Sequence, residues 1–411
     1  MAAEGEQAGR KTVLWLTYGL PWPTDRGCSI RYFNLIRRVA TRYRVLLFAM
    51  LESADEARHL PQLAPLCERV EWAVMRSGSV IARARDFCGH LQRGRPLVTW
   101  PYCSRALETK LRDLISTGAI DILQIEHSFL AHFRDAVPDS PPCRTILSFH
   151  NFCETQSRSM LGMQVGAVEK LGLLVRAFLM RGWEARHAAR FDRCLVVSEI
   201  EAQRLRAGAT GAAVSLVPNG VDTTALRPLP EAAAGKRLIF VGHLRYGPNI
   251  DAVRFLAHHI LPALRARIPA ARLTVVGEGT PRMLREFAGR DDIELVGRAS
   301  SPIPYYADAH VAVVPLRAGG GTRLKILEAM ALGRPVVSTP LGCEGLAVED
   351  GKHLLIANDA ETFAAAVAHL LTDRALAARL TEQARALVER DYDWTGIAER
   401  LFGVYDELLA I

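Results

Sequence analysis

Short apolar runs alternate with stretches in which apolar residues recur at helical spacing along most of the chain. The short runs are typical of strands buried on both faces, and the longer stretches are typical of amphipathic helices. The predicted strands of the first half are Thr12–Thr17, Val45–Met50, Val70–Val74, Ile120–Ile125, Thr145–Phe149, Cys194–Val197 and Val214–Val217. Those of the second half are Arg237–Val241, Arg272–Val276, Ile293–Val296, Val311–Val314, Val336–Ser338 and Leu354–Ile356. This alternation predicts parallel sheets covered by helices on both faces.

Helical spacing also predicts the main connections between these strands. In the first half, the predicted helices are Ser29–Ala40, Ser104–Ser116 and Val165–Arg190. In the second half, one helix begins at Pro248-Asn249 and continues to Leu264. Asn358 and Glu361 fit a capping box before a later helix.

The two series of strands and helices meet at Pro218–Pro230, a segment rich in proline, glycine and asparagine that is typical of a linker. We therefore predict an α/β chain with two doubly wound, Rossmann-like domains that face each other across a cleft. The first domain covers residues 1–218. Because ligands of such sheets bind outside the carboxyl ends of the strands, we expect functional residues in the loops that follow the strands.

One of these loops has an unusual composition. The stretch GGGTRLKILEAMALG, Gly319 to Gly333, follows the predicted strand Val311–Val314. Three glycines allow a ligand to approach the backbone closely, and the following helix offers free N–H groups to an anion. Arg323 and Lys325 add two cations, which indicates a phosphate site. It is not the Walker pattern, and the alternative is an ordinary turn with a solvated basic edge.

Charge and cysteine usage narrow the class of protein. Residues 1–222 contain 29 Lys and Arg against 22 Asp and Glu, an excess equal to the net charge of +7 of the whole chain. Such asymmetry predicts an anionic partner for the first domain. The eight cysteines are scattered without a C-x-x-C pair, which is typical of reduced thiols in a cytosol. No stretch is long and apolar enough to span a membrane, and no signal peptide is expected.

Several motifs together resemble glycosyltransferase family 4. FVGHLRYGPN, LTVVGEG, VGRASS, GGGTRLKILEAMALGRPVVST and EDGKHLLI resemble, in order and spacing, the second domain of that family. VPNGVD resembles its interdomain segment, and the loop Tyr18–Arg31 with the stretch FDRCLVVSE resembles parts of its first domain. The resemblance covers nearly the whole chain and is weakest over residues 50–120, where acceptor specificity would sit.

The resemblance implies a GT-B fold and a retaining transfer from a nucleotide-sugar donor held mainly by the second domain. That domain would cover residues 219–392, and residues 393–411 resemble a terminal helix that crosses back onto the first domain. The implied donor-binding residues are Gly27, Asn219, Gly242, Arg245, Glu278, Gly319, Gly320, Gly321, Thr322 and Glu328. Glu328 would accept hydrogen bonds from the ribose hydroxyls. Neither a metal nor another cofactor is implied, because protein cations and helix dipoles would carry the diphosphate charge.

The sequence departs from the family pattern at three positions. Gly320 stands where the family has the first Glu of its E-x7-E motif, and His243 and Pro248 stand where it has Arg and Lys. Arg323 and Lys325 are the natural replacements for these cations, with Arg245 as a further candidate. The alternative is a GT-B protein that has lost turnover and binds nucleotide or a partner enzyme.

Two histidines are candidates for the sugar end of the site. His150 follows the strand Thr145–Phe149 and fits the family's histidine that touches the sugar near the reacting carbon. His127 is the rival as an acceptor or sugar contact, and either residue could instead simply end a strand. The predicted catalytic residues are therefore His150, Arg323 and Lys325.

The sequence thus predicts a cytoplasmic hexosyltransferase that acts on a glycan or lipid-linked acceptor in cell-surface or exopolysaccharide biosynthesis. Nucleic acid is not an expected partner, and an oxidoreductase is disfavoured because no strand precedes G-x-G-x-x-G. We also expect the first domain to contact anionic membrane. The arginines behind this expectation are Arg37, Arg38, Arg42, Arg44, Arg176, Arg181, Arg186 and Arg190.

Overall fold

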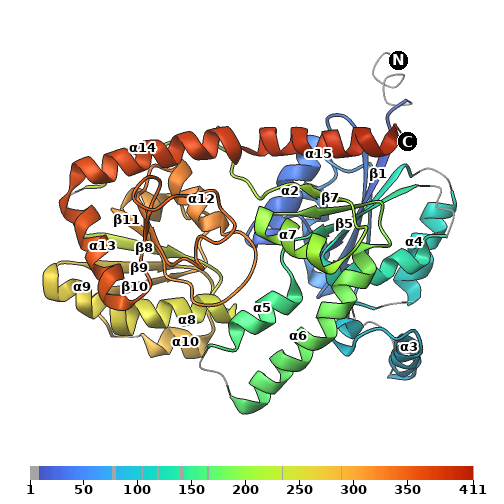
Figure 1. Cartoon of the computed structure of the whole chain (residues 1–411), viewed down its shortest axis with the longest axis horizontal. Helices are drawn as coiled ribbons and strands as arrows, with labels where there is room; N and C mark the ends of the chain where they lie inside the picture. The colour runs from blue at the N-terminus through green and yellow to red at the C-terminus, as the bar shows by residue number, and fades with distance from the viewer. Residues whose placement is uncertain are drawn as a thin grey trace. The chain divides into compact units, whose positions relative to one another are not determined.

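The structure is a computed structural model that describes residues 9–75, 80–103, 105–117, 120–138, 143–163, 166–233, 235–287 and 289–410. The chain divides into two compact units, coloured along the sequence in Figure 1. Unit 1 contains the residues up to Ser157, Leu171–Pro218 and the residues from Ala398 onward. Unit 2 contains Arg158–Lys170 and Asn219–Ile397.

Unit 1 is built on a parallel sheet in the order β3-β2-β1-β4-β5-β6-β7. Its strands are β1 (Thr12–Tyr18), β2 (Arg44–Leu51), β3 (Arg69–Val74), β4 (Ile122–Glu126), β5 (Arg144–Phe149), β6 (Arg193–Val196) and β7 (Val214–Leu216). In the centre, Val13 of β1 pairs with Val45 of β2 on one side and with Ile122 of β4 on the other. Strands β1 and β4 are almost completely buried, as expected for a parallel sheet covered on both faces.

The helices of unit 1 follow its strands in alternation. They are α2 (Gly27–Val39), η1 (Ala54–Gln62), α3 (Val80–Gln92), η2 (Leu97–Tyr102), α4 (Arg105–Ser116), η3 (Ser128–Ala136), α5 (Cys153–Met160), α6 (Ala167–Ala188) and α7 (Glu199–Gly208). Two of them are shared with unit 2, because the end of α5 from Arg158 and the start of α6 up to Lys170 belong to that unit. The last helix of the chain, α15 (Trp394–Leu409), contributes its residues from Ala398 onward to this unit.

Unit 2 contains a second parallel sheet, in the order β10-β9-β8-β11-β12-β13. Its strands are β8 (Arg237–Val241), β9 (Arg272–Val276), β10 (Ile293–Gly297), β11 (Val311–Val314), β12 (Val336–Ser338) and β13 (Leu355–Ile356). Its helices are α8 (Gly247–Phe255), η4 (Leu256–Ile260), α9 (Leu261–Arg267), α10 (Pro281–Glu286), α11 (Ile303–Ala307), α12 (Leu324–Ala331), α13 (Ala360–Thr372) and α14 (Arg374–Asp391). Within this unit, α12 and α14 lie on one side of the sheet and α8 and α9 on the other (Figure 1).

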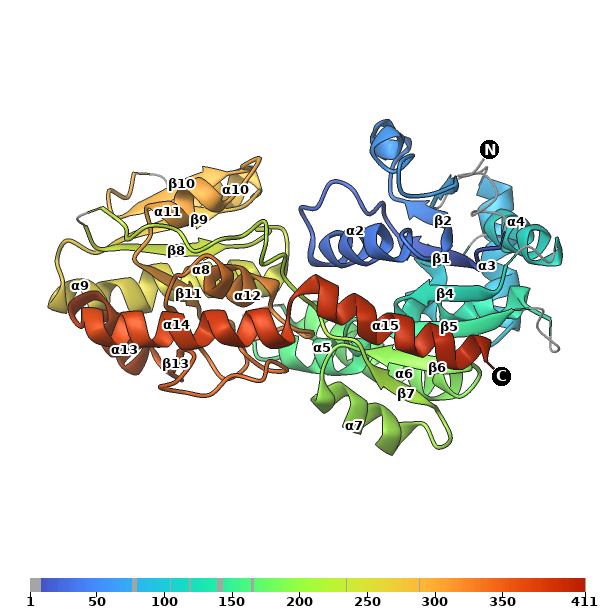
Figure 2. The ribbon, with the colours of Figure 1, turned by 90° about the horizontal axis from the view of Figure 1, so that it is seen from above.

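The structure confirms the predicted α/β class and two parallel sheets, which Figure 2 shows from above. One local prediction was wrong. The later helix is capped by Asp359 with Thr362 rather than by Asn358 with Glu361, because it begins one residue later than predicted. The helix predicted from Pro248 to Leu264 is confirmed as the continuous run α8, η4 and α9, with a π-helical segment just before Pro262, whose missing N–H prevents a regular α-helical bond. Ser104 and Val165, the first residues of two predicted helices, lie outside the described residues.

Each sheet reverses its strand order once. In unit 1, the chain builds outward from β1 to β3 and then returns to place β4 on the other side of β1. In unit 2, β8 and β11 are the corresponding neighbours. The loops that follow these two pairs of strands meet at the carboxyl edge of each sheet, which is where ligands of open α/β sheets bind.

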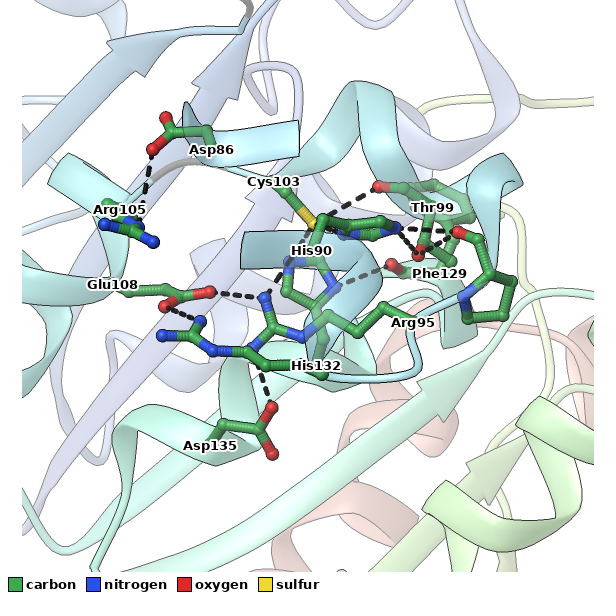
Figure 3. A network of polar contacts seen from close by, with 12 residues as sticks. Asp86, His90, Arg95, Thr99, Cys103, Arg105, Glu108, Phe129, His132 and Asp135 are labelled. Carbon is green, nitrogen blue, oxygen red and sulfur yellow. Dashed lines mark hydrogen bonds and ion pairs between the residues drawn. The ribbon is translucent and has the colours of Figure 1, made fainter. Parts of the chain in front are cut away.

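A buried polar network fixes one end of unit 1. Figure 3 shows the Arg95 guanidinium between Glu108 of α4 and Asp135 of η3, with N–O distances of 2.6 and 2.7 Å. Beside it, Cys103 Sγ lies 3.0 Å from His90 Nδ1 and 3.4 Å from His132 Nε2. Burial raises the pKa of the Cys103 thiol to about 12, so this sulfur is a packing group and not a nucleophile.

We expect Arg95→Ala to lower the free energy of unfolding by about 3–5 kcal/mol, because it leaves Glu108 buried without its buried partner. The matched control is Arg93→Ala. Arg93 pairs with the same carboxylate at 2.8 Å, but its side chain is 45% exposed and that of Arg95 only 3%. The control should cost about 0–1 kcal/mol. Urea denaturation measures both, and equal losses would show that the buried pair contributes no more than the exposed one.

Candidate functional site

The loop between β11 and α12 of unit 2 contains three glycines, and hydrogen bonds from the side chains of Ser159 and Arg323 hold its backbone. Gly319 and Gly321 have φ angles of +117° and +73°, which residues other than glycine rarely adopt. Ser159 Oγ accepts a hydrogen bond from Gly319 N at 2.9 Å and donates to Gly319 O at 3.0 Å. Arg323 Nη1 donates to the carbonyl oxygens of Gly320 and, at 2.7 Å, of Gly321. The loop therefore has a defined shape before any ligand arrives.

Lys325 extends from the first turn of α12 to the neighbouring loop that follows β8. Its Nζ donates to Asn249 Oδ1 at 3.0 Å and lies 4.1 Å from the centroid of the Phe240 ring. A Cβ on Gly242 would lie 2.7 Å from that Nζ, so only glycine leaves room for the ammonium group. The loop after β8, where His243 stands in place of a cation, thus receives its positive charge from a different helix.

The electrostatics of α12 favour an anionic ligand. Burial lowers the pKa of Lys325 to about 7 from its ordinary 10.5, and the charge of Arg323 adds to this effect while that of Glu328 opposes it. Burial also raises the pKa of Glu328, which Lys325 partly offsets. Within the described residues, no group donates a hydrogen bond to the Glu328 carboxylate. Lys325, whose charged form an anion would stabilise, and Glu328, whose carboxylate could accept a hydrogen bond, therefore lie one turn apart on α12.

Two glycines bring the loops after β8 and β9 into direct backbone contact. A Cβ on Gly277, whose φ is +152°, would lie 2.0 Å from the carbonyl oxygen of Gly242. The same loops are joined by an ion pair between Arg245 Nη2 and Glu278 Oε1 at 2.7 Å. Because the Arg245 side chain is 60% exposed and that of Glu278 36%, the pair is weak and Arg245 can exchange its partner for a ligand at little cost.

The predicted residues of unit 2 converge on this edge of the sheet. Asn219 Nδ2 donates to Thr322 Oγ1 at 2.8 Å, which connects the start of the unit to the glycine loop. Asn249 donates from Nδ2 to His243 O at 2.9 Å and accepts from Lys325 with its other amide atom. Sequence reasoning missed the roles of Ser159 and Asn249. The only available signal was the position of Asn249 at the start of a helix after a strand.

In unit 1, a chain of buried hydrogen bonds leads to His150. His150 Nε2 lies 2.5 Å from Glu126 Oε2, and Gln124 Nε2 donates to Glu126 Oε1 at 2.6 Å. Tyr405 Oη of α15 donates to Gln124 Oε1, also at 2.6 Å. The side chain of Glu126 is fully buried and that of His150 is 10% exposed. The imidazole is therefore held in one orientation by groups from β4 and from the end of the chain.

The charges within this cluster balance each other. Burial alone would raise the pKa of Glu126, but the hydrogen bond and charge of His150, together with Arg31 and Gln124, lower it below its ordinary value. Burial lowers the pKa of His150, although Glu126 opposes the change. Arg31 is completely buried and donates from Nη1 to Pro218 O at 2.8 Å. Because the pKa values of Glu126 and His150 are both lowered, Glu126 is a carboxylate that orients a mainly neutral imidazole.

His127 stacks against His150, with ring centroids 4.0 Å apart, and against Phe129 at 4.8 Å. Its φ of +80° is the only positive value for a residue other than glycine in the described chain. Its Nε2 is buried without a hydrogen-bond partner among those residues. Strain and an unsatisfied polar atom at a strand end are both typical of functional positions. The structure thus brings together the two predicted histidines.

Aromatic rings extend this cluster at the carboxyl end of β1. Tyr18 makes edge contacts with Tyr102 at 5.5 Å and with Phe129 at 5.7 Å. The network around Arg95 holds the segments that carry Tyr102 and Phe129. The remaining predicted residue of unit 1, Gly27, is exposed at the first position of α2. Gln124 and Tyr405 were not predicted, because the resemblance implies that the last helix returns to the first domain but not which strand it reaches.

The chain is similar to known glycosyltransferases. A family model described as Glycosyltransferase Family 4 matches residues 26–225, and one described as Glycosyl transferases group 1 matches residues 235–373. A phosphatidyl-myo-inositol mannosyltransferase of Mycobacterium leprae is 26% identical over 313 residues, which cover 74% of this chain and 78% of that protein.

Two solved structures share the fold. Sucrose-phosphate synthase from Thermosynechococcus elongatus superposes with a TM-score of 0.73 at 19% identity, over 98% of this chain and 100% of that one. Anabaena Alr3699/HepE in complex with UDP and glucose superposes with a TM-score of 0.68 at 14% identity, over 97% and 100% of the two chains. Both are similar in fold, which confirms the predicted GT-B class.

Proposed function

The chain belongs to glycosyltransferase family 4, and on this premise we propose that it transfers a hexose from a nucleotide sugar to a glycan or lipid-linked acceptor with retention of anomeric configuration. The observation that carries the proposal is the position of Lys325. Its ammonium group lies beside Gly242 and Asn249, one turn before Glu328, whose carboxylate accepts no hydrogen bond within the described residues. A diphosphate and the adjoining ribose would satisfy both groups.

The proposed chemistry breaks the bond between the anomeric carbon and the diphosphate oxygen. Negative charge then grows on the leaving diphosphate, and Lys325, Arg323 and the N–H groups at the start of α12 would stabilise it. These groups would perform the role that a metal ion has in other transferases, so we propose a reaction that requires no metal or other cofactor. The oxygen of the acceptor hydroxyl would form the new bond on the same face of the sugar, and the hydroxyl proton would pass to the leaving diphosphate.

We assign His150 to the sugar end of the donor. Glu126 fixes the orientation of its ring by accepting a hydrogen bond from Nε2. The other ring nitrogen, Nδ1, of a mainly neutral imidazole can accept a hydrogen bond from a sugar hydroxyl without adding a charge. His127 is assigned to a sugar or acceptor contact because its buried Nε2 lacks a partner among the described residues. Gly27 would leave room for the donor phosphate at the start of α2.

The proposed acceptor is a glycan or a lipid-linked glycan. The proposed reaction takes place in the cytoplasm and belongs to cell-surface or exopolysaccharide biosynthesis. The similarity to a phosphatidyl-myo-inositol mannosyltransferase supports an acceptor that carries a polyol headgroup on a lipid. All eight cysteines are free, which is consistent with a reducing compartment.

Incubation with UDP-glucose or GDP-mannose tests the proposal directly. We expect slow release of the nucleoside diphosphate without acceptor and an α-configured sugar as the first product seen by NMR, since both donors are α-linked. A β-configured first product would contradict retention. Binding of a nucleoside diphosphate without any turnover would favour the alternative that Gly320 suggests, a GT-B protein that binds nucleotide only.

Glu328→Ala should weaken binding of the preferred donor by about 1.5–3 kcal/mol, because a charge-assisted hydrogen bond to the ribose is lost. The stability of the unliganded protein should change little, since the carboxylate has no hydrogen-bond donor among the described residues. Thermal shift with and without nucleoside diphosphate measures both quantities. Glu328→Gln is the control and should lose less, and wild-type binding by the alanine variant would overturn the assignment of this helix.

Donor affinity should depend on the charge of Lys325. A bound diphosphate favours the ammonium form and raises its pKa above the value of about 7 in the free protein. The contribution to binding is therefore complete below about pH 7 and falls as pH rises, by up to about tenfold per pH unit. Calorimetry with UDP-glucose, whose diphosphate does not titrate in this range, measures the effect.

Lys325→Arg provides the control for this pH dependence, because a guanidinium stays charged throughout the range. Its donor affinity should be flat from about pH 6 to about pH 9. An equally flat profile for the wild-type protein would show that the donor does not contact Lys325.

A further inference from the structure

Helix α6 carries an exposed apolar stripe on the face that points away from unit 1. Of the nine large apolar side chains that are exposed in the described chain, five lie on this helix, and four of these belong to unit 1. The four are Leu171, Leu174, Val175 and Phe178. Leu171 is 62% exposed and Phe178 is 79% exposed. At about 100° per residue they occupy one side of the helix.

The stripe is not needed to hold the helix in place. The opposite face of α6 is buried through Leu173, Ala177, Met180 and Trp183. Trp183 Nε1 donates to the carbonyl oxygen of Ser128 at 3.2 Å, and Glu184 accepts from the Ser128 hydroxyl at 2.6 Å. The helix, labelled α6 in Figure 1, is thus anchored to unit 1 by the face opposite the stripe.

Basic residues border the stripe. Lys170 and Arg181 lie along one edge and Arg186 along the other, and all three are exposed. Glu169 is the exposed acid of this helix, and it lies away from the stripe. Of the arginines expected to face a membrane, Arg42, Arg44 and Arg190 instead form ion pairs within unit 1, with Asp406, Glu68 and Asp135. The outward face of α6 is therefore more apolar, and more sharply bordered by cations, than the sequence suggested.

We propose that this face of α6 docks onto an anionic lipid bilayer, with Leu171 and Phe178 in the acyl boundary and the flanking cations at the headgroups. The span from Leu171 to Phe178 is about 11 Å, which suits a helix that lies in the interface. No helix of the described chain is long and apolar enough to cross a membrane. A second copy of the chain is a poorer occupant, because pairing two such stripes would bring like charges together.

The docking deepens the proposed function by presenting the enzyme to a lipid-linked acceptor, but it does not depend on the sugar chemistry. Co-sedimentation with vesicles of equal parts phosphatidylglycerol and phosphatidylcholine tests it, with pure phosphatidylcholine vesicles as the comparison. The wild-type protein should bind the anionic vesicles and release them at high salt. The double variant Leu171→Gln/Phe178→Gln should bind about tenfold or more weakly. Arg181→Gln and Arg186→Gln should each weaken binding about fivefold, equivalent to about 1 kcal/mol.

Matched controls are Ile200→Gln on α7 and Arg112→Gln on α4, which remove one exposed apolar and one exposed basic side chain elsewhere in unit 1. Both should bind vesicles as the wild-type protein does. Unchanged thermal shift with nucleoside diphosphate in the stripe variants separates lost docking from lost folding or donor binding. The proposal is wrong if Leu171→Gln/Phe178→Gln retains vesicle binding, or if the wild-type protein binds neutral vesicles as well as anionic ones or binds neither kind. It is also wrong if this double variant instead abolishes self-association or the binding of another protein.

Discussion

The single reversal of strand order in each sheet determines where this protein can hold a ligand. Helices that follow β8 and β11 leave toward opposite faces, so neither covers the backbone at the carboxyl ends of these two neighbouring strands. Every polar element of the unit 2 site depends on that opening. The glycine loop, the Gly242 backbone and the Lys325 ammonium group meet there because β8 and β11 are adjacent in the sheet while 69 residues lie between them in the chain.

The charged form of Lys325 is destabilised in the unliganded site of unit 2. Its ammonium group lies beside Phe240 and Gly242, where burial removes it from water and lowers its pKa. An anion that restores its charge therefore recovers free energy, and the loop needs no rearrangement because Ser159 and Arg323 already hold it. Lys325 lies beside the loop that contains His243, and we propose that it supplies the charge that the family's cations would supply there.

Unit 1 holds the imidazole of His150 in one orientation while leaving it mainly neutral. Glu126 supplies orientation, and burial opposes protonation of His150. The hydrogen bond from Tyr405 through Gln124 makes the orientation depend on the end of the chain. α15 therefore does more than add apolar contacts, since its hydroxyl completes a chain of bonds that ends at the histidine.

Sequence periodicity by itself determined the strands, their parallel arrangement and the loops that carry the site, because the alternation of apolar and polar residues is a local property. It also indicated Lys325 and Glu328, since a glycine turn followed by cations on a helix needs no distant partner to be recognised. It misplaced the helix cap at Asp359 by one residue. Only the tertiary structure decided that Lys325 charges the loop after β8, that Ser159 holds Gly319 and that Tyr405 reaches Gln124. Each of these contacts joins residues 76 to 281 positions apart, and such pairings follow from how the sheets and helices pack, which no local pattern records.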